Sequence, residues 1–182
     1  VTSTTIDTSL TGVLTYGTTV ESVVINADAG STVFNVNSTS GASTMSINAG
    51  DGDDTVNVGA GDFTFNVNND ITVVGGAGND LLNIDDLLDA TARTWTYQFG
   101  SIGVPATTDT IFFSTLFVAD ATERVSLAAG TGADTINVPS TGINTDATLN
   151  GGGGNDTVNV ANVAQDLDVV DGGMSIVGGL GS

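Results

Sequence analysis

The most regular feature of the chain is a short alternation of apolar and polar residues that follows a Gly/Asp-rich segment. In the segment 55–58, Val56 and Val58 point to one side of an extended strand, and Thr55 and Asn57 point to the other. The same alternation returns at 33–36, 81–84, 135–138 and 157–160. This period of two predicts half-buried strands. Helical spacing appears at 85–93 and predicts a helix of at most about two turns.

The apolar residue before each Gly/Asp segment marks an internal repeat. These anchors are Ile25, Ile47, Val73, Leu127, Leu149 and Ile176. Successive anchors are 22, 26, 54, 22 and 27 residues apart, and the step of 54 is interpreted as two coils, one without the motif. Repeats of this length are typical of solenoids, in which each unit buries its apolar face against its neighbours. The pattern predicts an all-β, right-handed parallel β-solenoid (β-roll or β-helix) of about seven coils of 22–28 residues.

A longer repeat is superimposed on the coils. Residues 21–58 align without gaps on residues 123–160, an offset of 102, with 16 identities in 38 positions. We therefore expect residues 1–182 to form a single solenoid segment with super-repeat copies at approximately 1–102 and 103–182, the second incomplete. We also expect the segment to belong to a longer repeat protein.

Stacking the coils in register predicts columns of like residues. The predicted interior column contains Val56, Leu82, Ile136 and Val158. The predicted outer column contains Asn35, Asn57, Asn83, Asn137 and Asn159, where amide ladders can form.

The composition limits the chemistry that the chain can perform. It has 21 acidic residues, two basic residues, no His and no Cys, and a formal net charge of −19. These counts exclude disulfides, a Cys/His zinc site and a Ser-His-Asp triad. They also argue against binding nucleic acid or anionic membranes, which require positive charge. No apolar run approaches the roughly 18 residues of a membrane span, so we expect no membrane insertion. With 40% apolar residues the chain can still bury a core, and the expected partner is a cation.

The Gly/Asp segments follow a nine-residue pattern. Residues 75–83 and 151–159 fit G-G-x-G-x-D-x-U-x, in which U is a large apolar residue, and residues 49–57 and 129–137 fit it with Ala first. An earlier, degenerate copy has Thr32 in place of the Asp. The pattern resembles the calcium-binding nonapeptide of hemolysin-type, repeats-in-toxin-like β-rolls. Its spacing, with one motif per long coil, resembles the long β-strand repeats of bacterial surface proteins.

The resemblance implies that Ca²⁺ ions lie between successive turns, because Ca²⁺ takes six to eight oxygen ligands. The implied side-chain ligands are Asp54, Asp80, Asp134 and Asp156, paired as 54 with 80 and 134 with 156. The implied turn residues are Gly50, Asp51, Gly52, Asp53, Gly76, Gly78, Asn79, Gly130, Gly132, Gly152, Gly154 and Asn155. We expect one edge of the solenoid to carry all the metal. The opposite edge would carry the variable loops 37–43, 59–70 and 161–173.

The other polar and aromatic residues have simpler interpretations. We expect solvated loop charges at Asp62, Asp70, Asp85, Asp86, Asp89, Asp166, Asp168 and Asp171, with a glycosidase pair at Asp85 and Asp86 as an alternative. The aromatic residues Trp95, Tyr97, Phe99, Phe112, Phe113 and Phe117 would fill an enlarged coil or, alternatively, form a carbohydrate platform. Arg93 is expected to neutralise the acidic run before it, and Arg124 to pair with Glu123.

By resemblance, the expected function is structural and not enzymatic. The chain would be a calcium-stabilised repeat module of a large secreted or cell-surface bacterial protein, such as the stalk of an adhesin, a matrix fibre or a surface layer. Its partners would be calcium ions, together with copies of itself or components of the cell surface and matrix. Two alternatives remain: a head-to-tail subunit of an extracellular filament, and a fragment of a polysaccharide-active β-helix enzyme.

Overall fold

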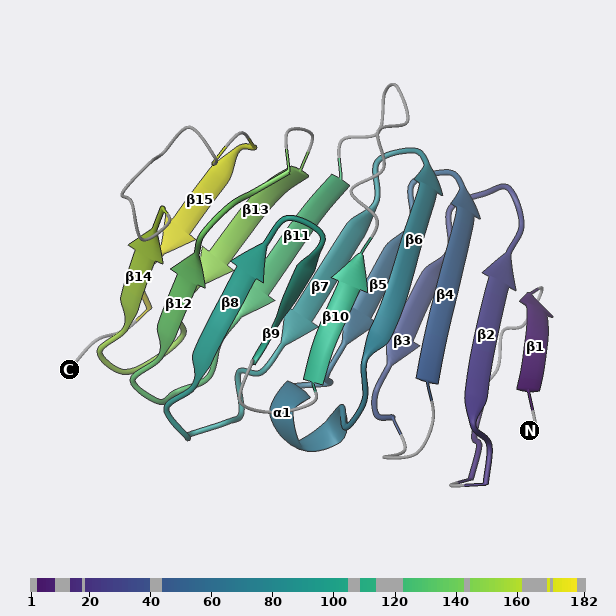
Figure 1. The fold of residues 1–182 in the computed structure, drawn as a ribbon, viewed down its shortest axis with the longest axis horizontal. Coiled ribbons are helices and arrows are strands. Elements are labelled where there is room, and N and C mark those ends of the chain that lie inside the picture. The colour runs from purple at the N-terminus through teal and green to yellow at the C-terminus, as the bar shows by residue number, and fades with distance from the viewer. Residues whose placement is uncertain are drawn as a thin grey trace.

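The computed structural model describes residues 3–8, 14–17, 19–39, 44–104, 109–113, 123–142, 145–161, 170 and 172–179. These residues form an all-β solenoid of about five turns, made of two stacked sheets (Figure 1). Their longest helix is the single turn α1 (Phe63–Asn66), so this part of the chain contains no helix able to cross a membrane.

Sheet A, the nine-stranded sheet, has the spatial order β1-β2-β4-β6-β10-β9-β8-β12-β14. Its strands are β1 (Ser3–Thr8), β2 (Ser22–Ala27), β4 (Thr44–Asp51), β6 (Ile71–Ala77), β8 (Thr94–Gln98), β9 (Ser101–Val104), β10 (Asp109–Phe113), β12 (Thr135–Val138) and β14 (Thr157–Val160). Neighbours pair in parallel except for β9, which is antiparallel to both β8 and β10.

Sheet B, the six-stranded sheet, has the order β15-β13-β11-β7-β5-β3 and pairs in parallel throughout. Its strands are β3 (Val33–Val36), β5 (Thr55–Val58), β7 (Leu81–Asp85), β11 (Glu123–Ala128), β13 (Thr145–Asn150) and β15 (Met174–Val177). The predicted alternation of sides is confirmed, since β5 and β7 bury every second residue. The buried residues of both sheets form one apolar core.

From β2 onward the chain passes alternately from one sheet to the other, except that β8, β9 and β10 follow one another within sheet A, so the solenoid has two edges. We call the edge where the chain leaves sheet A for sheet B the A-to-B edge, and the opposite one the B-to-A edge. All strands of sheet A except β9 point toward the A-to-B edge (Figure 1). Turns on one edge therefore stack only on other turns that follow a strand of the same sheet.

The predicted count of seven coils is not confirmed, because the long step between Val73 and Leu127 is not two ordinary coils. Its pass through sheet A consists of three strands, β8, β9 and β10, instead of one. Two of its aromatic residues, Trp95 and Tyr97, are fully buried, which confirms the prediction of bulky core filling at these positions, whereas Phe99 is 48% exposed. The side chains of Phe112, Phe113 and Phe117 lie outside the described residues.

This junction moves the second super-repeat copy to the opposite sheets. Val56 aligns with Leu82 in sheet B, whereas Ile136 aligns with Val158 in sheet A, so the single interior column is wrong. The predicted amide ladders do form, but as separate pieces. In sheet B, Asn57 donates to Asn35 (2.9 Å) and Asn83 donates to Asn57 (3.3 Å). In sheet A, Asn159 donates to Asn137 at 3.0 Å.

Candidate metal centres

The Gly/Asp turns stack closely because their glycines leave room for the backbone of the adjacent coil. Gly76 has a φ of 110°, and a Cβ atom there would lie 1.7 Å from the carbonyl oxygen of Gly50. The Gly52 N–H donates to the Ala77 carbonyl at 2.7 Å. The turn conformation and the contact between coils therefore both require glycine at position 76.

On the A-to-B edge, the motif aspartates are linked through the backbone into a column. Asp54 Oδ1 accepts the N–H of Thr32 at 2.7 Å, and Asp80 Oδ1 accepts the N–H of Asp54 at 2.9 Å. We call Thr32, Asp54 and Asp80 the A-to-B column. The predicted stacking of Asp54 and Asp80 in adjacent coils is confirmed.

A second column with the same bonding lies on the B-to-A edge. Asp134 Oδ1 accepts the N–H of Arg93 at 2.7 Å, and Asp156 Oδ1 accepts the N–H of Asp134 at 2.9 Å. We call Arg93, Asp134 and Asp156 the B-to-A column. The predicted stacking of Asp134 and Asp156 in adjacent coils is confirmed. The prediction that all motif turns share one edge is wrong. The turns of Asp134 and Asp156 follow β11 and β13, which are strands of sheet B, and therefore lie on the B-to-A edge.

Three of the four predicted side-chain ligands carry a carboxylate oxygen without a hydrogen bond. Asp54, Asp80 and Asp134 are 1%, 7% and 1% exposed, and in each the Oδ2 atom is buried and has no hydrogen-bond partner. Burial raises the pKa of all three carboxyl groups above the ordinary value of 3.8, although a backbone N–H opposes the shift. A charged carboxylate in this setting needs a nearby positive charge.

Asp54 and Asp80 are among the residues that line a cavity of about 20 Å³ between adjacent coils. This volume accommodates about one water-sized species. The rest of the wall is largely apolar, with Val56 and Leu82 among its residues, and Arg124 adds a positive charge. The column therefore contains a small space next to two acidic groups.

In the two nonapeptides that begin with Gly, this first residue lies beside the Asp of the same turn. A Cβ atom at Gly75 would lie 2.3 Å from Asp80 Oδ2, and one at Gly151 would lie 2.5 Å from Asp156 Oδ2. The first glycine of the motif thus makes space for the second carboxylate oxygen.

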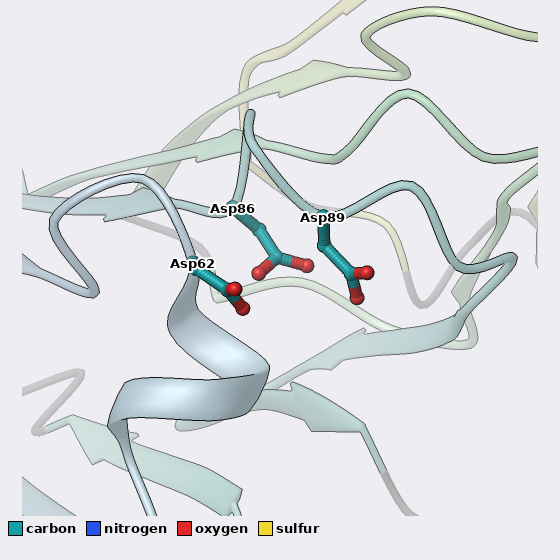
Figure 2. A group of neighbouring side chains, drawn as sticks. All are labelled: Asp62, Asp86 and Asp89. Atoms are coloured by element: carbon teal, nitrogen blue, oxygen red, sulfur yellow. The ribbon is translucent and has the colours of Figure 1, made fainter.

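A further acidic group lies on the B-to-A edge, where no metal was expected. The side chains of Asp62, Asp86 and Asp89 each place a carboxylate oxygen within 4.8 Å of the others, and this cluster could hold a metal ion. Figure 2 shows Asp62 at the start of α1, with its carboxylate facing the loop that carries the other two. Asp86 is 0% and Asp89 8% exposed, so the interpretation of these two as solvated loop charges is wrong.

Asp89 is held by its own loop. Its Oδ1 accepts the Thr91 N–H at 2.8 Å, and its Oδ2 pairs with Arg93 Nε at 2.6 Å, which confirms the predicted role of Arg93. The sequence does contain a signal for this cluster, because Asp62 and Asp86 are separated by one coil length. That signal was missed because the segment 85–93 suggested a short helix, whereas the structure has a turn there.

The remaining predicted turn residues lie in the same four turns. Gly50 and Asp51 are the last residues of β4, and Gly52 and Asp53 connect it to β5. Gly76 lies near the end of β6, and Gly78 and Asn79 connect this strand to β7. Gly130 and Gly132 join β11 to β12, and Gly152, Gly154 and Asn155 join β13 to β14. Arg124 donates to the Asn79 Oδ1 atom at 3.0 Å, a contact that was not predicted. The side chain of Glu123 and the residues Asp166, Asp168 and Asp171 lie outside the described part of the chain.

No protein-family model, curated protein or solved structure matches the chain.

Proposed function

We propose that the chain is a calcium-stabilised structural repeat module. In this proposal Ca²⁺ ions bind between stacked Gly/Asp turns, Asp54 with Asp80 on one edge and Asp134 with Asp156 on the other. Backbone carbonyls of the turns 49–53, 75–79, 129–133 and 151–155 supply the remaining oxygen ligands. The module would act as a stiff spacer whose rigidity depends on calcium.

The observation that supports this proposal most strongly is the set of buried Oδ2 atoms of Asp54, Asp80 and Asp134. They occupy equivalent positions of the motif and lack hydrogen-bond partners. A buried polar atom without a partner costs about 1–3 kcal/mol, and a charged one costs more. Three such atoms at one motif position indicate a shared function rather than isolated defects of packing.

Calcium fits the chemistry of these positions better than a transition metal does. Carboxylate and carbonyl oxygens are hard ligands that Ca²⁺ and Mg²⁺ prefer, and the chain has no Cys or His to favour zinc or copper. Ca²⁺ accepts irregular sets of six to eight oxygens, as two flexible turns would provide, whereas Mg²⁺ demands a regular octahedron. The cluster of Asp62, Asp86 and Asp89 would be an additional site for the same ion.

The proposed setting is the outside of a bacterial cell, as part of a secreted or surface protein. Calcium sites of extracellular modules typically have dissociation constants of about 10⁻⁴–10⁻³ M, so such sites fill outside the cell and empty within it. We propose a mechanical role and no enzymatic activity. The expected partners besides calcium are copies of the chain or components of the cell surface and matrix.

Calcium titration with two readouts tests the proposal. Trp95 is the single tryptophan of the chain and is fully buried, so its emission reports on the junction, while far-UV circular dichroism reports on all strands. We expect a chelator to lower the unfolding midpoint. Added calcium should restore the midpoint, whereas magnesium at the same concentration should not. The highest calcium concentration is 10⁻² M, which is about tenfold above the largest expected dissociation constant. The proposal would be contradicted if the unfolding midpoint and the circular dichroism spectrum did not change between chelator and this concentration.

A further inference from the structure

Both basic side chains of this protein lie at the inner ends of the two aspartate columns. Arg93 and Arg124 are the only Lys or Arg residues in 182, against 21 acidic residues. Each belongs to a coil at the junction between the two super-repeat copies, where one column ends and the other begins. Such a placement of the only two cations calls for a physical explanation.

Arg124 lies in the coil that follows Asp80. Its N–H donates to the Asp80 carbonyl at 2.8 Å, so β11 stacks directly on the last motif turn of the A-to-B column. Arg124 is one of the residues that line the cavity beside Asp54 and Asp80, and its Nε donates to Asn79 Oδ1 at 3.0 Å. The positive charge of Arg124 also opposes the rise in the pKa of Asp80 that burial causes.

Arg93 begins the B-to-A column. The Thr135 N–H donates to the Arg93 carbonyl just as the Leu81 N–H donates to the Asp54 carbonyl, so Arg93 occupies the position of the motif Asp in its coil. Its N–H binds Asp134 Oδ1, and its guanidinium pairs with Asp89. A cation therefore stands where the pattern elsewhere places an anion.

We propose that Arg93 and Arg124 are built-in counter-ions that replace a metal ion at the inner ends of the two columns. The inner end of each column then needs no metal, and the calcium requirement of the columns falls on the pairs Asp54–Asp80 and Asp134–Asp156. The cluster of Asp62, Asp86 and Asp89 is not part of either column. This inference rests on the proposed function for its calcium part only. The neutralising role of the two arginines can be tested without metal.

Charge replacement and simple packing predict different responses to salt and calcium. If the charge matters, its removal leaves the metal-free column more negative, which destabilises the fold and strengthens calcium binding. If only packing or a hydrogen bond matters, stability falls equally in all conditions. Both arginines are partly or largely exposed, so we expect a change in calcium affinity of about two- to fivefold.

The experiment compares Arg93→Gln, Arg124→Gln and the matching Lys variants with the natural chain. Urea midpoints are measured in chelator at about 20 mM and about 500 mM NaCl, because the higher salt shortens the screening length to a few ångströms. Calcium affinity is measured by calorimetry in the low-salt buffer. We expect the Gln variants to lose stability at low salt, to recover at high salt, and to bind calcium more tightly, while the Lys variants resemble the natural chain.

A loss that is equal at both salt concentrations and is not restored by Lys would overturn the inference. A Gln variant that does not fold at low salt but folds at high salt supports the inference. If the Gln variant does not fold at either salt concentration and the Lys variant does not fold either, the inference is contradicted. A natural chain that shows no calcium response would refute the proposed function instead. The salt comparison would then still decide whether the arginines neutralise the columns.

Discussion

Replacing Asp80 by Asn should change the stability of the protein in opposite directions with and without calcium. The Asn side chain has nearly the same shape, and its Oδ1 atom can still accept the Asp54 N–H that Asp80 accepts at 2.9 Å. The substitution removes the negative charge and replaces the buried Oδ2 atom, which has no hydrogen-bond partner. It therefore isolates the electrostatic part of the site from its backbone contact.

Without metal, the variant should be more stable than the natural chain. A buried carboxylate oxygen without a partner costs more than a neutral amide in the same place, for which the penalty is about 1–3 kcal/mol. Repulsion between carboxylates adds to this cost, since Asp80 raises the pKa of Asp54, and Asp53 raises the pKa of both. We expect Asp80→Asn to raise the free energy of unfolding in chelator by about 1 kcal/mol.

With calcium, the order should reverse. If the site binds with a dissociation constant of 10⁻⁴–10⁻³ M, about 10 mM calcium stabilises the natural chain by about 1.4–2.7 kcal/mol. The variant loses most of this gain because the carboxylate supplies the charge that attracts the ion. After its advantage of about 1 kcal/mol in chelator is subtracted, Asp80→Asn should be at most about 0.4–1.7 kcal/mol less stable than the natural chain.

Equilibrium urea unfolding in chelator and in calcium measures both values on the same samples. The matched control is Asp146→Asn on the outer face of β13, where the exposed carboxylate accepts the Gly173 N–H at 3.1 Å through Oδ1. The control removes the same charge and keeps the same kind of hydrogen bond. It should leave the calcium-dependent gain in stability unchanged.

The reasoning would be refuted if Asp80→Asn were destabilising by the same amount in chelator and in calcium. Such a result would mean that the side chain contributes only its bond to the Asp54 backbone. A full calcium response in the variant would likewise show that the ion does not use this carboxylate.

Three further predictions follow from the same structure. In chelator, the contributions of Asp54, Asp80 and Asp134 to stability should be complete below pH 3.8 and should decline as the pH rises through their raised folded-state pKa values. Thermal unfolding measured across this pH range would show the decline. Calcium should remove it, because the ion binds the deprotonated carboxylates. Gly76→Ala should cost more than about 2 kcal/mol in urea unfolding, whereas Gly17→Ala, where a Cβ meets nothing within 4 Å, should cost less than about 0.5 kcal/mol. Asn57→Ala, which breaks two ladder bonds, should cost about 1 kcal/mol, and Asn159→Ala, which breaks its bond to Asn137, about half of that; equal losses would contradict the ladder interpretation.

The local structure of each coil could be predicted from the sequence because it depends on neighbouring residues. Alternation in the segment 55–58 determines which side chains face the core, and this alternation is observed in β5. The motif also predicted that Asp54 would lie next to Asp80, since both follow a Gly-rich turn of the same length. These features need only the period of a strand and the conformational freedom of glycine.

The junction could not be predicted because its residues give no repeat signal. The 54-residue step between Val73 and Leu127 has the length of two coils, and length alone does not show that β9 runs antiparallel within sheet A. The cluster of Asp62, Asp86 and Asp89 was missed because the segment 85–93 suggested a short helix, although Asp62 and Asp86 are one coil length apart. Its members come from two loops outside the nonapeptide pattern, and only the stacking of these loops brings their carboxylates together.

The number of sheet passes between motifs, not the number of residues, decides which edge a motif occupies. Consecutive motifs within a copy are separated by two passes, one through each sheet, and remain on one edge. Between the turns of Asp80 and Asp134 the chain passes through sheet B, sheet A and sheet B again, and the odd count moves the motif to the opposite edge. Each column therefore contains only two consecutive motif aspartates before it meets a coil that carries an arginine, Arg124 on one edge and Arg93 on the other. Because like charges in a continuous column of four would repel along its whole length, dividing them between two edges limits the repulsion that any metal-free column must withstand.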